Sequence, residues 1–356
     1  MPANQSDPPN ISVITPTKNR LKLLGETIDS VQRQSFGAWE HIIVDDGSDD
    51  GTAQEVASRA AEDPRIRYIP RNGEKSGANV CRNIGLRKSR SNLIVLLDSD
   101  DQLRPGCLER RVEIMTRNAE LDFSVFQGCV FVNSVGDLNR LYHPQTTGDD
   151  LLRFLSHECV WEITSPIWRR GFLEKLGGFD EALLSMQDME LHVRAICAAP
   201  KYIFIPEIDH DIRGQDDITR TSMRHFRQPS YIAAAEQVRE KLCEAVLGAG
   251  LMTWSRQRAL VGLCFGNAES WVRAKQLGTA LRVWTSGCRQ PHASAFLWIA
   301  GAAMLCIRRA GAIDNGFCAR LVNKWKGWVR FRQEPSLLPA NKRYQKSSVT
   351  TKHLTP

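Results

Sequence analysis

The chain has 356 residues, of which 42% are hydrophobic and 24% charged, as is ordinary for a soluble globular protein. Its formal net charge of +7 is too small to indicate a nucleic-acid-binding protein unless the basic residues cluster. Ten cysteines are scattered singly with no CxxC pair, so they indicate neither a zinc site nor a redox motif, and reduced thiols in a cytoplasmic protein are expected.

Two features near the chain ends bear on targeting. The first nine residues are polar and proline-rich, which predicts a disordered N-terminus rather than a secretory signal. The longest apolar stretch, residues 293–307, is interrupted by Ser294 and Gly301. A membrane-spanning helix needs ~20 apolar residues. We therefore expect a buried or interfacial helix there.

Strand and helix patterns alternate along the first hundred residues. Apolar strand runs occur at 11–16, 41–44, 66–69 and 93–97, and helical periodicity occurs at 23–34, 54–62 and 76–88. Pro16 is expected to end the first strand because proline cannot donate to a ladder. This alternation predicts a series of βαβ units with a parallel sheet.

The later chain is expected to complete the sheet and then become helical. Further strands are predicted at 123–132 and 202–205, and further helices at 107–118, 149–156, 170–176, 188–199, 233–247, 256–276 and 280–285. The predicted segments are a disordered N-terminus (1–9), an α/β domain (10–228), a helical region (229–333) and a disordered polar tail (334–356).

Residues 308–332 combine basic side chains with Trp325, Trp328 and Phe331. Basic residues interleaved with aromatic ones are typical of a helix on an anionic membrane surface. The alternatives are an amphipathic helix packed on its own domain, with a solvated basic face, and an oligomerisation segment.

The stretch 93–101 is the strongest functional signal. A five-residue apolar run, typical of a strand buried on both faces, leads directly into Asp98, Asp100 and Asp101. Ligands of open α/β sheets collect beyond the carboxyl ends of such strands. In extended backbone Asp98 and Asp100 would point to the same side and would repel each other unless a cation or a donor-rich ligand lay between them. The stretch therefore predicts a divalent-metal and nucleotide-phosphate site; the alternative is a helix N-cap followed by a polar turn.

Six motifs in order resemble the inverting family 2 glycosyltransferases. They are V-I-T-P-T-K-N-R (13–20), V-D-D-G-S-D-D-G-T (44–52), R-N-I-G-L (82–86), L-D-S-D-D (97–101), G-G-F-D-E (177–181) and Q-D-M-E-L-H-V-R (187–194). The resemblance covers about residues 10–225. It implies an α/β fold of the GT-A type, Rossmann-like with a mostly parallel sheet flanked by helices, to which this chain adds a C-terminal helical region.

The resemblance also implies a nucleotide-sugar donor, usually UDP-linked, bound with Mg²⁺ or Mn²⁺. The implied donor-binding residues are Pro16, Thr17, Arg20, Asp45, Asp46, Arg82 and Asp98. Among these, Asp46 would accept from the base and Asp98 would face the ribose, while Asp100 would coordinate the metal. Lys18 departs from the family, which usually has a tyrosine there to stack on the base.

For the chemistry, the resemblance implies that Asp188 is the general base. A helix start would favour its ionised form, although an aspartate there is most often an N-cap. Gln187 stands where the family commonly has glutamate. The remaining candidates are Asp180 and Glu181 for acceptor hydroxyls, unless their turn is only structural, and Arg213 and Arg220, which resemble a basic loop over the donor diphosphate. His210 is expected to be either an extra metal ligand or a surface residue.

The function that follows is a metal-dependent transfer of one sugar from a nucleoside diphosphate sugar to a saccharide, lipid-linked or protein acceptor, in cell-surface polysaccharide or glycan synthesis. No nucleic-acid partner is expected. The expected location is the cytoplasm, with peripheral association at the inner face of the membrane. The alternatives are a nucleotidyltransferase, whose usual glycine-rich phosphate loop the stretch T-P-T-K-N-R lacks, and a catalytically inactive nucleotide-sugar-binding protein.

Overall fold

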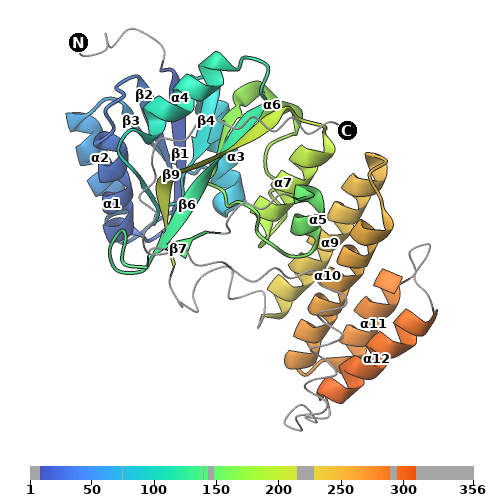
Figure 1. Cartoon of the computed structure of the whole chain (residues 1–356). Coiled ribbons are helices and arrows are strands. Elements are labelled where there is room, and N and C mark those ends of the chain that lie inside the picture. Colours follow the sequence, from blue (N-terminus) through green and yellow to red (C-terminus); the bar gives the residue numbers. More distant parts are fainter. Residues whose placement is uncertain are drawn as a thin grey trace.

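The computed structural model describes residues 9–73, 75–138, 140–142, 148–214, 228–288 and 295–309. It confirms the predicted α/β fold class, with a C-terminal helical region set beside the sheet (Figure 1). The described strands form a nine-stranded sheet in the order β3-β2-β1-β4-β8-β6-β9-β5, with β7 paired to β6. The first half, β3-β2-β1-β4, is parallel as expected, and the second half is mixed.

The elements have the following bounds. The strands are β1 (Ile11–Thr17), β2 (Trp39–Asp45), β3 (Ile66–Pro70), β4 (Leu93–Leu96), β5 (Gln102–Leu103), β6 (Phe123–Phe131), β7 (Arg140–Leu141), β8 (Pro166–Arg169) and β9 (Tyr202–Arg213). The helices are α1 (Leu21–Gln32), α2 (Thr52–Glu62), α3 (Ala78–Lys88), α4 (Cys107–Arg117), α5 (Asp150–Leu155), α6 (Arg170–Lys175), α7 (Gln187–Cys197), α9 (Pro229–Gly248), α10 (Trp254–Arg273), α11 (Leu277–Cys288) and α12 (Ala295–Arg309).

Strand β1 is central and is buried on both faces. Successive side chains point to opposite faces of a strand. Val13 therefore joins the core cluster under α1, which contains Leu24 and Ile28, while Ile14 joins the cluster under α3, which contains Leu86. This two-sided burial explains why the first strands are nearly continuous apolar runs.

Helix α3 lies close against β1 at Gly85, where an added Cβ would lie 2.3 Å from Cγ2 of Ile14. Gly85→Ala is expected to lower the free energy of unfolding by about 1–3 kcal/mol, because overpacking forces the helix away from the strand. Denaturant unfolding measures the change. Gly171→Ala is the matched control, because Gly171 also lies in a helix but has open space at its Cβ position. Equal stability of the Gly85→Ala and wild-type proteins would contradict this packing.

The structure differs from the predicted elements in several places, and the two-residue strands β5 and β7 were not predicted. Strand β1 continues through Thr17 rather than ending at Pro16. Strand β4 pairs only with residues 12–14 of β1, so Pro16 lies beyond that ladder on one side. Strand β9 extends to Arg213 rather than ending at residue 205, and β8 was not predicted. Both contain polar residues that hide the apolar pattern of a strand.

The C-terminal helices do not form an isolated core. Val238 of α9 and Leu260 of α10 belong to the same buried cluster as Leu191 of α7 and Phe123 of β6. Helices α10, α11 and α12 form a second cluster around Trp284. All described strands therefore precede the predicted boundary at 228, but the buried contacts are continuous across it.

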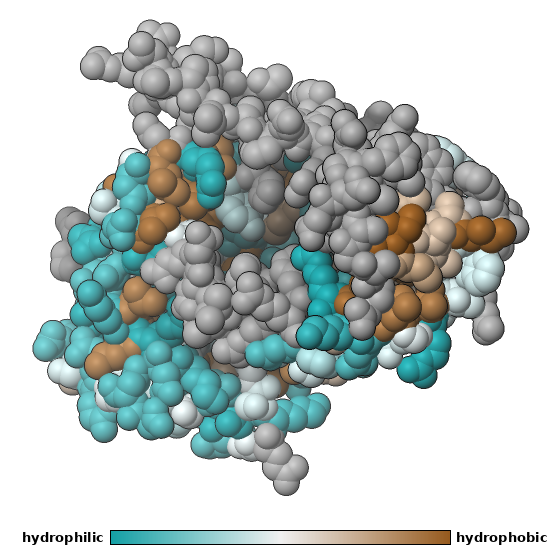
Figure 2. Space-filling model, turned by 90° about the horizontal axis from the view of Figure 1, so that it is seen from below, coloured by the Kyte–Doolittle hydropathy of each residue, from teal (hydrophilic) through white to brown (hydrophobic). Residues whose placement is uncertain are grey.

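Helix α12 begins at Ala295, contains residues 295–307 of the apolar stretch and is partly exposed. Trp254 of α10 and Trp298 and Ile299 of α12 are exposed. Figure 2 shows hydrophobic residues gathered on the side where the C-terminal helices lie. Within the described part of the chain, no helix is long and apolar enough to cross a membrane. Residues 310–332 of the basic segment and the tail 334–356 lie outside the described residues, so the membrane-surface and tail predictions remain predictions.

Candidate functional site

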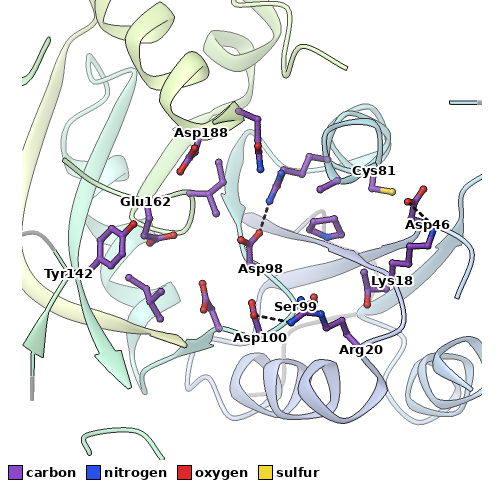
Figure 3. A pocket seen from close by; sticks show the side chains of 18 residues that line it. Lys18, Arg20, Asp46, Cys81, Asp98, Ser99, Asp100, Tyr142, Glu162 and Asp188 are labelled. Atoms are coloured by element: carbon purple, nitrogen blue, oxygen red, sulfur yellow. Dashed lines mark hydrogen bonds and ion pairs between the residues drawn. The ribbon is translucent and has the colours of Figure 1, made fainter. Parts of the chain in front are cut away.

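A cavity of about 410 Å³ opens at the carboxyl ends of β1, β2 and β4 (Figure 3). The predicted site residues that line it are Pro16, Thr17, Arg20, Asp46, Arg82, Asp98, Asp100 and Asp188. Parallel strands place their carboxyl ends at one edge of a sheet, so motifs far apart in the sequence meet there. The structure thus brings the donor-binding candidates other than Asp45, the metal-ligand candidate and the candidate base into one cavity.

The two aspartates after β4 are held by different arginines. Arg82 Nη2 lies 2.6 Å from Asp98 Oδ1, and Arg20 Nη1 lies 3.1 Å from Asp100 Oδ2. The sequence analysis expected extended backbone here, and that expectation is wrong. The amide of Asp101 donates to the carbonyl of Asp98 at 3.2 Å and closes a turn. The N-cap alternative is wrong, since helix α4 begins only at Cys107 with Gly106 as its N-cap.

Asp45, the last residue of β2, and the adjacent Asp46 have different partners. The carboxylate of Asp45 accepts from the Ser48 hydroxyl at 2.6 Å and from the Tyr68 hydroxyl at 2.8 Å, and it does not line the cavity, so its donor-binding role remains a prediction. Asp46 does line the cavity and lies 2.5 Å from Arg71 Nε. Lys18, which takes the place of the usual tyrosine, has its ammonium 3.7 Å from Asp46.

The third aspartate of the D-S-D-D motif is crowded by negative charge. Burial, together with the charges of Asp100, Glu162 and Asp98, raises the pKa of Asp101 well above its ordinary value. Its carboxylate accepts from the backbone amide of Arg213 at 2.9 Å. A positive ion at this position would relieve the repulsion between these carboxylates.

The described residues contain no group of three or more His, Cys, Asp or Glu side chains that could hold a metal ion without other ligands. Mg²⁺ typically uses only one or two carboxylates and takes its other ligands from phosphate and water. The carboxylates after β4 therefore fit a divalent cation that takes its remaining ligands from a bound diphosphate and water.

Asp188 is the second residue of α7, and the cap position belongs to Met186, so the N-cap alternative is wrong. Met186 has a left-handed backbone (φ 56°), which is uncommon for a residue other than glycine and turns the chain sharply into the helix. Burial raises the pKa of Asp188 above its ordinary value, and the negative charges of Asp98 and Glu162 act in the same direction. Burial thus outweighs the helix-start effect that the sequence suggested.

Three other predicted residues lie away from the cavity lining. Asp180 pairs with Lys241 of α9 at 2.9 Å, and Glu181 accepts from Asn83 of α3 at 3.0 Å, so the G-G-F-D-E turn connects these helices. Arg213 donates to Glu26 at 2.5 Å and to the carbonyl of Asp100. Arg220 lies outside the described residues. The acceptor and diphosphate roles of these four residues remain predictions.

The structure adds Tyr142 and Glu162 to the cavity, with Cys159 beside them. Tyr142 is hydrogen-bonded to Cys159, and the Cys159 thiol is 3.9 Å from Asp188 Oδ2. No sequence motif marks these residues, because they lie in irregular segments that fold back over the sheet. The only available signal was an acidic residue inside the apolar segment around Trp161.

Trp161 and Trp168 are packing residues and do not line the cavity. Both are buried among Phe123, Phe154 and Phe172. Among the described residues, eight cysteines are free thiols and most are buried, as expected for reduced cysteines.

Comparisons with known proteins identify similar sequences and similar structures. Residues 12–165 match the family model "Glycosyl transferase family 2". The chain is 36% identical over 132 residues to the GalNAc(5)-diNAcBac-PP-undecaprenol beta-1,3-glucosyltransferase of Campylobacter jejuni, a match that covers 37% of this chain and 41% of that protein. It is 35% identical over 155 residues to TuaG of Bacillus subtilis, a putative teichuronic acid biosynthesis glycosyltransferase, covering 43% of this chain and 60% of that one.

The matched segments thus span about half the length of these relatives. Among solved structures, TarS 1–349 of S. aureus, crystallised in complex with UDP-GlcNAc, superposes with a TM-score of 0.62. Its identity to this chain is 19%, and the match covers 91% of this chain and 93% of TarS 1–349. At that identity the likeness establishes the fold.

Proposed function

We propose that the chain is a glycosyltransferase of family 2, and that it transfers one sugar from a nucleoside diphosphate sugar to an acceptor hydroxyl, with inversion at the anomeric carbon. One observation carries the proposal: Asp98, Asp100 and Asp188 line a single cavity although 90 residues separate the motifs that supply them. The first two suit a metal and a nucleotide, and the third suits an acceptor.

In the proposed reaction Asp188 accepts the proton of the acceptor hydroxyl as that oxygen attacks the anomeric carbon opposite the diphosphate. A raised pKa makes a carboxylate a stronger base, provided that it is ionised at the working pH. The thiol of Cys159 and the amide of Met189 both lie against this carboxylate and orient it. Inversion follows because attack and departure occur on opposite faces of the sugar.

The donor would lie along the sheet edge. Asp100 would hold Mg²⁺ or Mn²⁺, which when bound neutralises charge on the leaving diphosphate. Pro16 and Thr17 would lie against the nucleoside and Asp98 against the ribose, with Arg82 fixing the position of Asp98. We propose a UDP-sugar. Because Lys18 offers a cation where an aromatic ring usually stacks, GDP- and dTDP-sugars belong in the same test.

The names of the relatives support a role in cell-surface glycan synthesis. The Campylobacter jejuni protein is named for an undecaprenol-linked substrate, and TuaG for teichuronic acid biosynthesis. We propose a saccharide or lipid-linked acceptor, with the protein acting at the inner face of the membrane. The exposed Trp298 and Ile299 of α12 are compatible with a surface that contacts lipid.

The test is donor turnover. Purified protein with Mn²⁺ and a panel of UDP-, GDP- and dTDP-sugars should slowly release nucleoside diphosphate. Binding without release from any donor would favour an inactive binding protein. Pyrophosphate made from a sugar phosphate and a nucleoside triphosphate would instead identify a nucleotidyltransferase.

Asp100→Asn is expected to raise the Mn²⁺ concentration needed for half-maximal donor turnover by at least roughly tenfold, because it removes the anionic ligand. Titration of turnover with Mn²⁺ measures the effect. Asp29→Asn is the matched control: Asp29 is also paired with an arginine, Arg59, but it does not line the cavity. An unchanged Mn²⁺ requirement in Asp100→Asn would refute the metal assignment.

A further inference from the structure

A buried chain of four charged side chains runs from helix α4 to the cavity. Arg111 donates from Nε and Nη2 to the two carboxylate oxygens of Asp209, at 2.7 and 2.9 Å. His210 lies between Asp209 and Glu162, and each of its ring nitrogens is 2.7 Å from a carboxylate oxygen. All four side chains are almost fully buried, and only Glu162 lines the cavity. His210 is therefore neither a surface residue nor free to bind a metal.

When Asp209 and Glu162 are both ionised, each accepts a hydrogen bond from one ring nitrogen of His210, so the imidazole carries a proton on both nitrogens. Burial by itself lowers the pKa of His210, but the hydrogen bonds to Asp209 and Glu162 and the charges of these two carboxylates outweigh it, so the pKa is raised. The two positive charges, on Arg111 and His210, then balance the two negative charges on their carboxylate partners. Buried charges are stable only when they are paired in this way.

The Glu162 side chain is held in one orientation from the protein side. His210 and the Ser165 hydroxyl, at 3.1 Å, donate to Oε1, and the amide of Thr164 donates to Oε2 at 2.6 Å. A carboxylate has about four acceptor positions. The described residues fill three of them, which leaves one position on Oε2 for a donor in the cavity.

Glu162 lies at the acceptor end of the cavity. Figure 3 shows Glu162 with Tyr142 and Asp188, well separated from Lys18 and Asp46 at the nucleotide end. The charge of Glu162 contributes to the raised pKa values of both Asp188 and Tyr142, as expected for neighbouring groups. The proposed base thus has a second, rigid carboxylate beside it.

Resting on the proposed function, we propose that Glu162 accepts a hydrogen bond from a second hydroxyl of the acceptor, next to the one that Asp188 deprotonates. The acceptor is then a polyhydroxylated molecule, a sugar or a polyol, rather than a simple alcohol. Glu162 is not itself the base, because its oxygens are already held by His210, the Ser165 hydroxyl and the Thr164 amide. Its role is to orient the acceptor, which lowers the entropic cost of the reaction.

The experiment uses the full chain with a donor that it turns over. Methyl glycosides of glucose, galactose, N-acetylglucosamine and N-acetylgalactosamine serve as probes, together with their monodeoxy analogues. In Glu162→Gln the KM for the best sugar should rise roughly ten- to a hundredfold, the usual effect of losing a hydrogen bond to a charged group, with the donor KM as the internal reference. One deoxy sugar should have the same raised KM with wild type as with the variant. Removing the sugar hydroxyl and replacing the carboxylate abolish the same hydrogen bond, so the two effects do not add.

Glu40→Gln is the matched control. Glu40 is also a buried glutamate that accepts from a serine hydroxyl and pairs with arginines, Arg67 and Arg90, but it does not line the cavity. It should leave the sugar KM unchanged. Glu162→Asp, which keeps the charge but retracts it, should give an intermediate KM.

The outcomes separate the two proposals. No donor turnover by wild type refutes the proposed function itself. Two results with wild type overturn this inference alone. In the first, no sugar in the set alters donor turnover. In the second, the sugar KM does not change when any hydroxyl other than the attacked one is removed. An unchanged sugar KM in Glu162→Gln also overturns it. The deoxy-sugar series on wild type does not depend on how well the variants fold.

Discussion

Asp188→Asn is expected to lower kcat for sugar transfer by roughly 10²- to 10⁴-fold, with donor affinity close to that of wild type. The amide keeps the shape of the carboxylate and its position at the start of α7, but it cannot accept the acceptor proton. Steady-state transfer assays measure kcat, and calorimetric titration with the nucleoside diphosphate measures the affinity for the donor nucleotide. Turnover like that of wild type would remove Asp188 from the reaction.

The same assignment determines the acid side of the pH profile. The proposed base works only when ionised, and the pKa of Asp188 is raised above its ordinary value. Wild-type activity should therefore decline, as the pH falls, at a higher pH than an ordinary aspartate would produce, and the residual activity of Asp188→Asn should lack this decline. Asp150→Asn is the matched control, since burial also raises the pKa of Asp150 in the first turn of α5, away from the cavity.

Arg111→Met is expected to lower the free energy of unfolding by about 3–5 kcal/mol, the usual cost of removing one partner from a buried ion pair. Arg111 is fully buried, and its loss would leave the Asp209 carboxylate without its strongest partner. Arg111 Nη1 also donates to the carbonyl of Thr164 at 2.8 Å, so the segment carrying Glu162 would lose an anchor. Urea unfolding followed by circular dichroism measures the change.

Arg110→Met, the adjacent position on α4, is the control. Arg110 is partly exposed and pairs with Glu113 and Glu207, so its removal should cost at most about 1 kcal/mol. The double variant Arg111→Met/Asp209→Leu should recover part of the lost stability, because it removes both charges. A loss in Arg111→Met no larger than in Arg110→Met would show that the ion pair is not essential.

The pH dependence of stability has a definite sign. The Arg111 guanidinium outweighs the effect of burial and holds the pKa of Asp209 at about 2, below its ordinary value of 3.8. The resulting stabilisation is present above the ordinary pKa and is lost as the pH falls toward 2. Wild type should lose this contribution between pH 4 and pH 2, in the interval that those two values define.

The sequence by itself determined the parallel half of the fold and most of the cavity. Apolar runs alternating with helical periodicity located β1, β2, β3 and β4 and the helices between them, because local periodicity reports which faces are buried. The rule that ligands meet the carboxyl ends of parallel strands then put Asp46, Asp98 and Asp100 near one another. The structure has all three in one cavity.

Only the tertiary structure decided which of two adjacent side chains faces the cavity and which packs inside the protein. Asp45 and Asp46 are adjacent in a strand-end motif, yet one packs against Tyr68 and the other faces the cavity. A short-range pattern cannot distinguish them, because the difference lies in which partner occupies each side of the strand. The pKa of Asp188 shows the same limit: the helix start is visible in the sequence, whereas the burial that outweighs it is not.

The second half of the sheet and the acceptor end of the cavity were also decided by tertiary contacts. Strand β9 carries Asp209 and His210 inside the protein, where the sequence indicated only polar residues. They are stable there because Arg111 and Glu162, which lie 98 and 48 residues away from their partners along the chain, neutralise them. A buried charge is favourable only when its partner is present, and that partner is chosen by the folded chain rather than by neighbouring sequence.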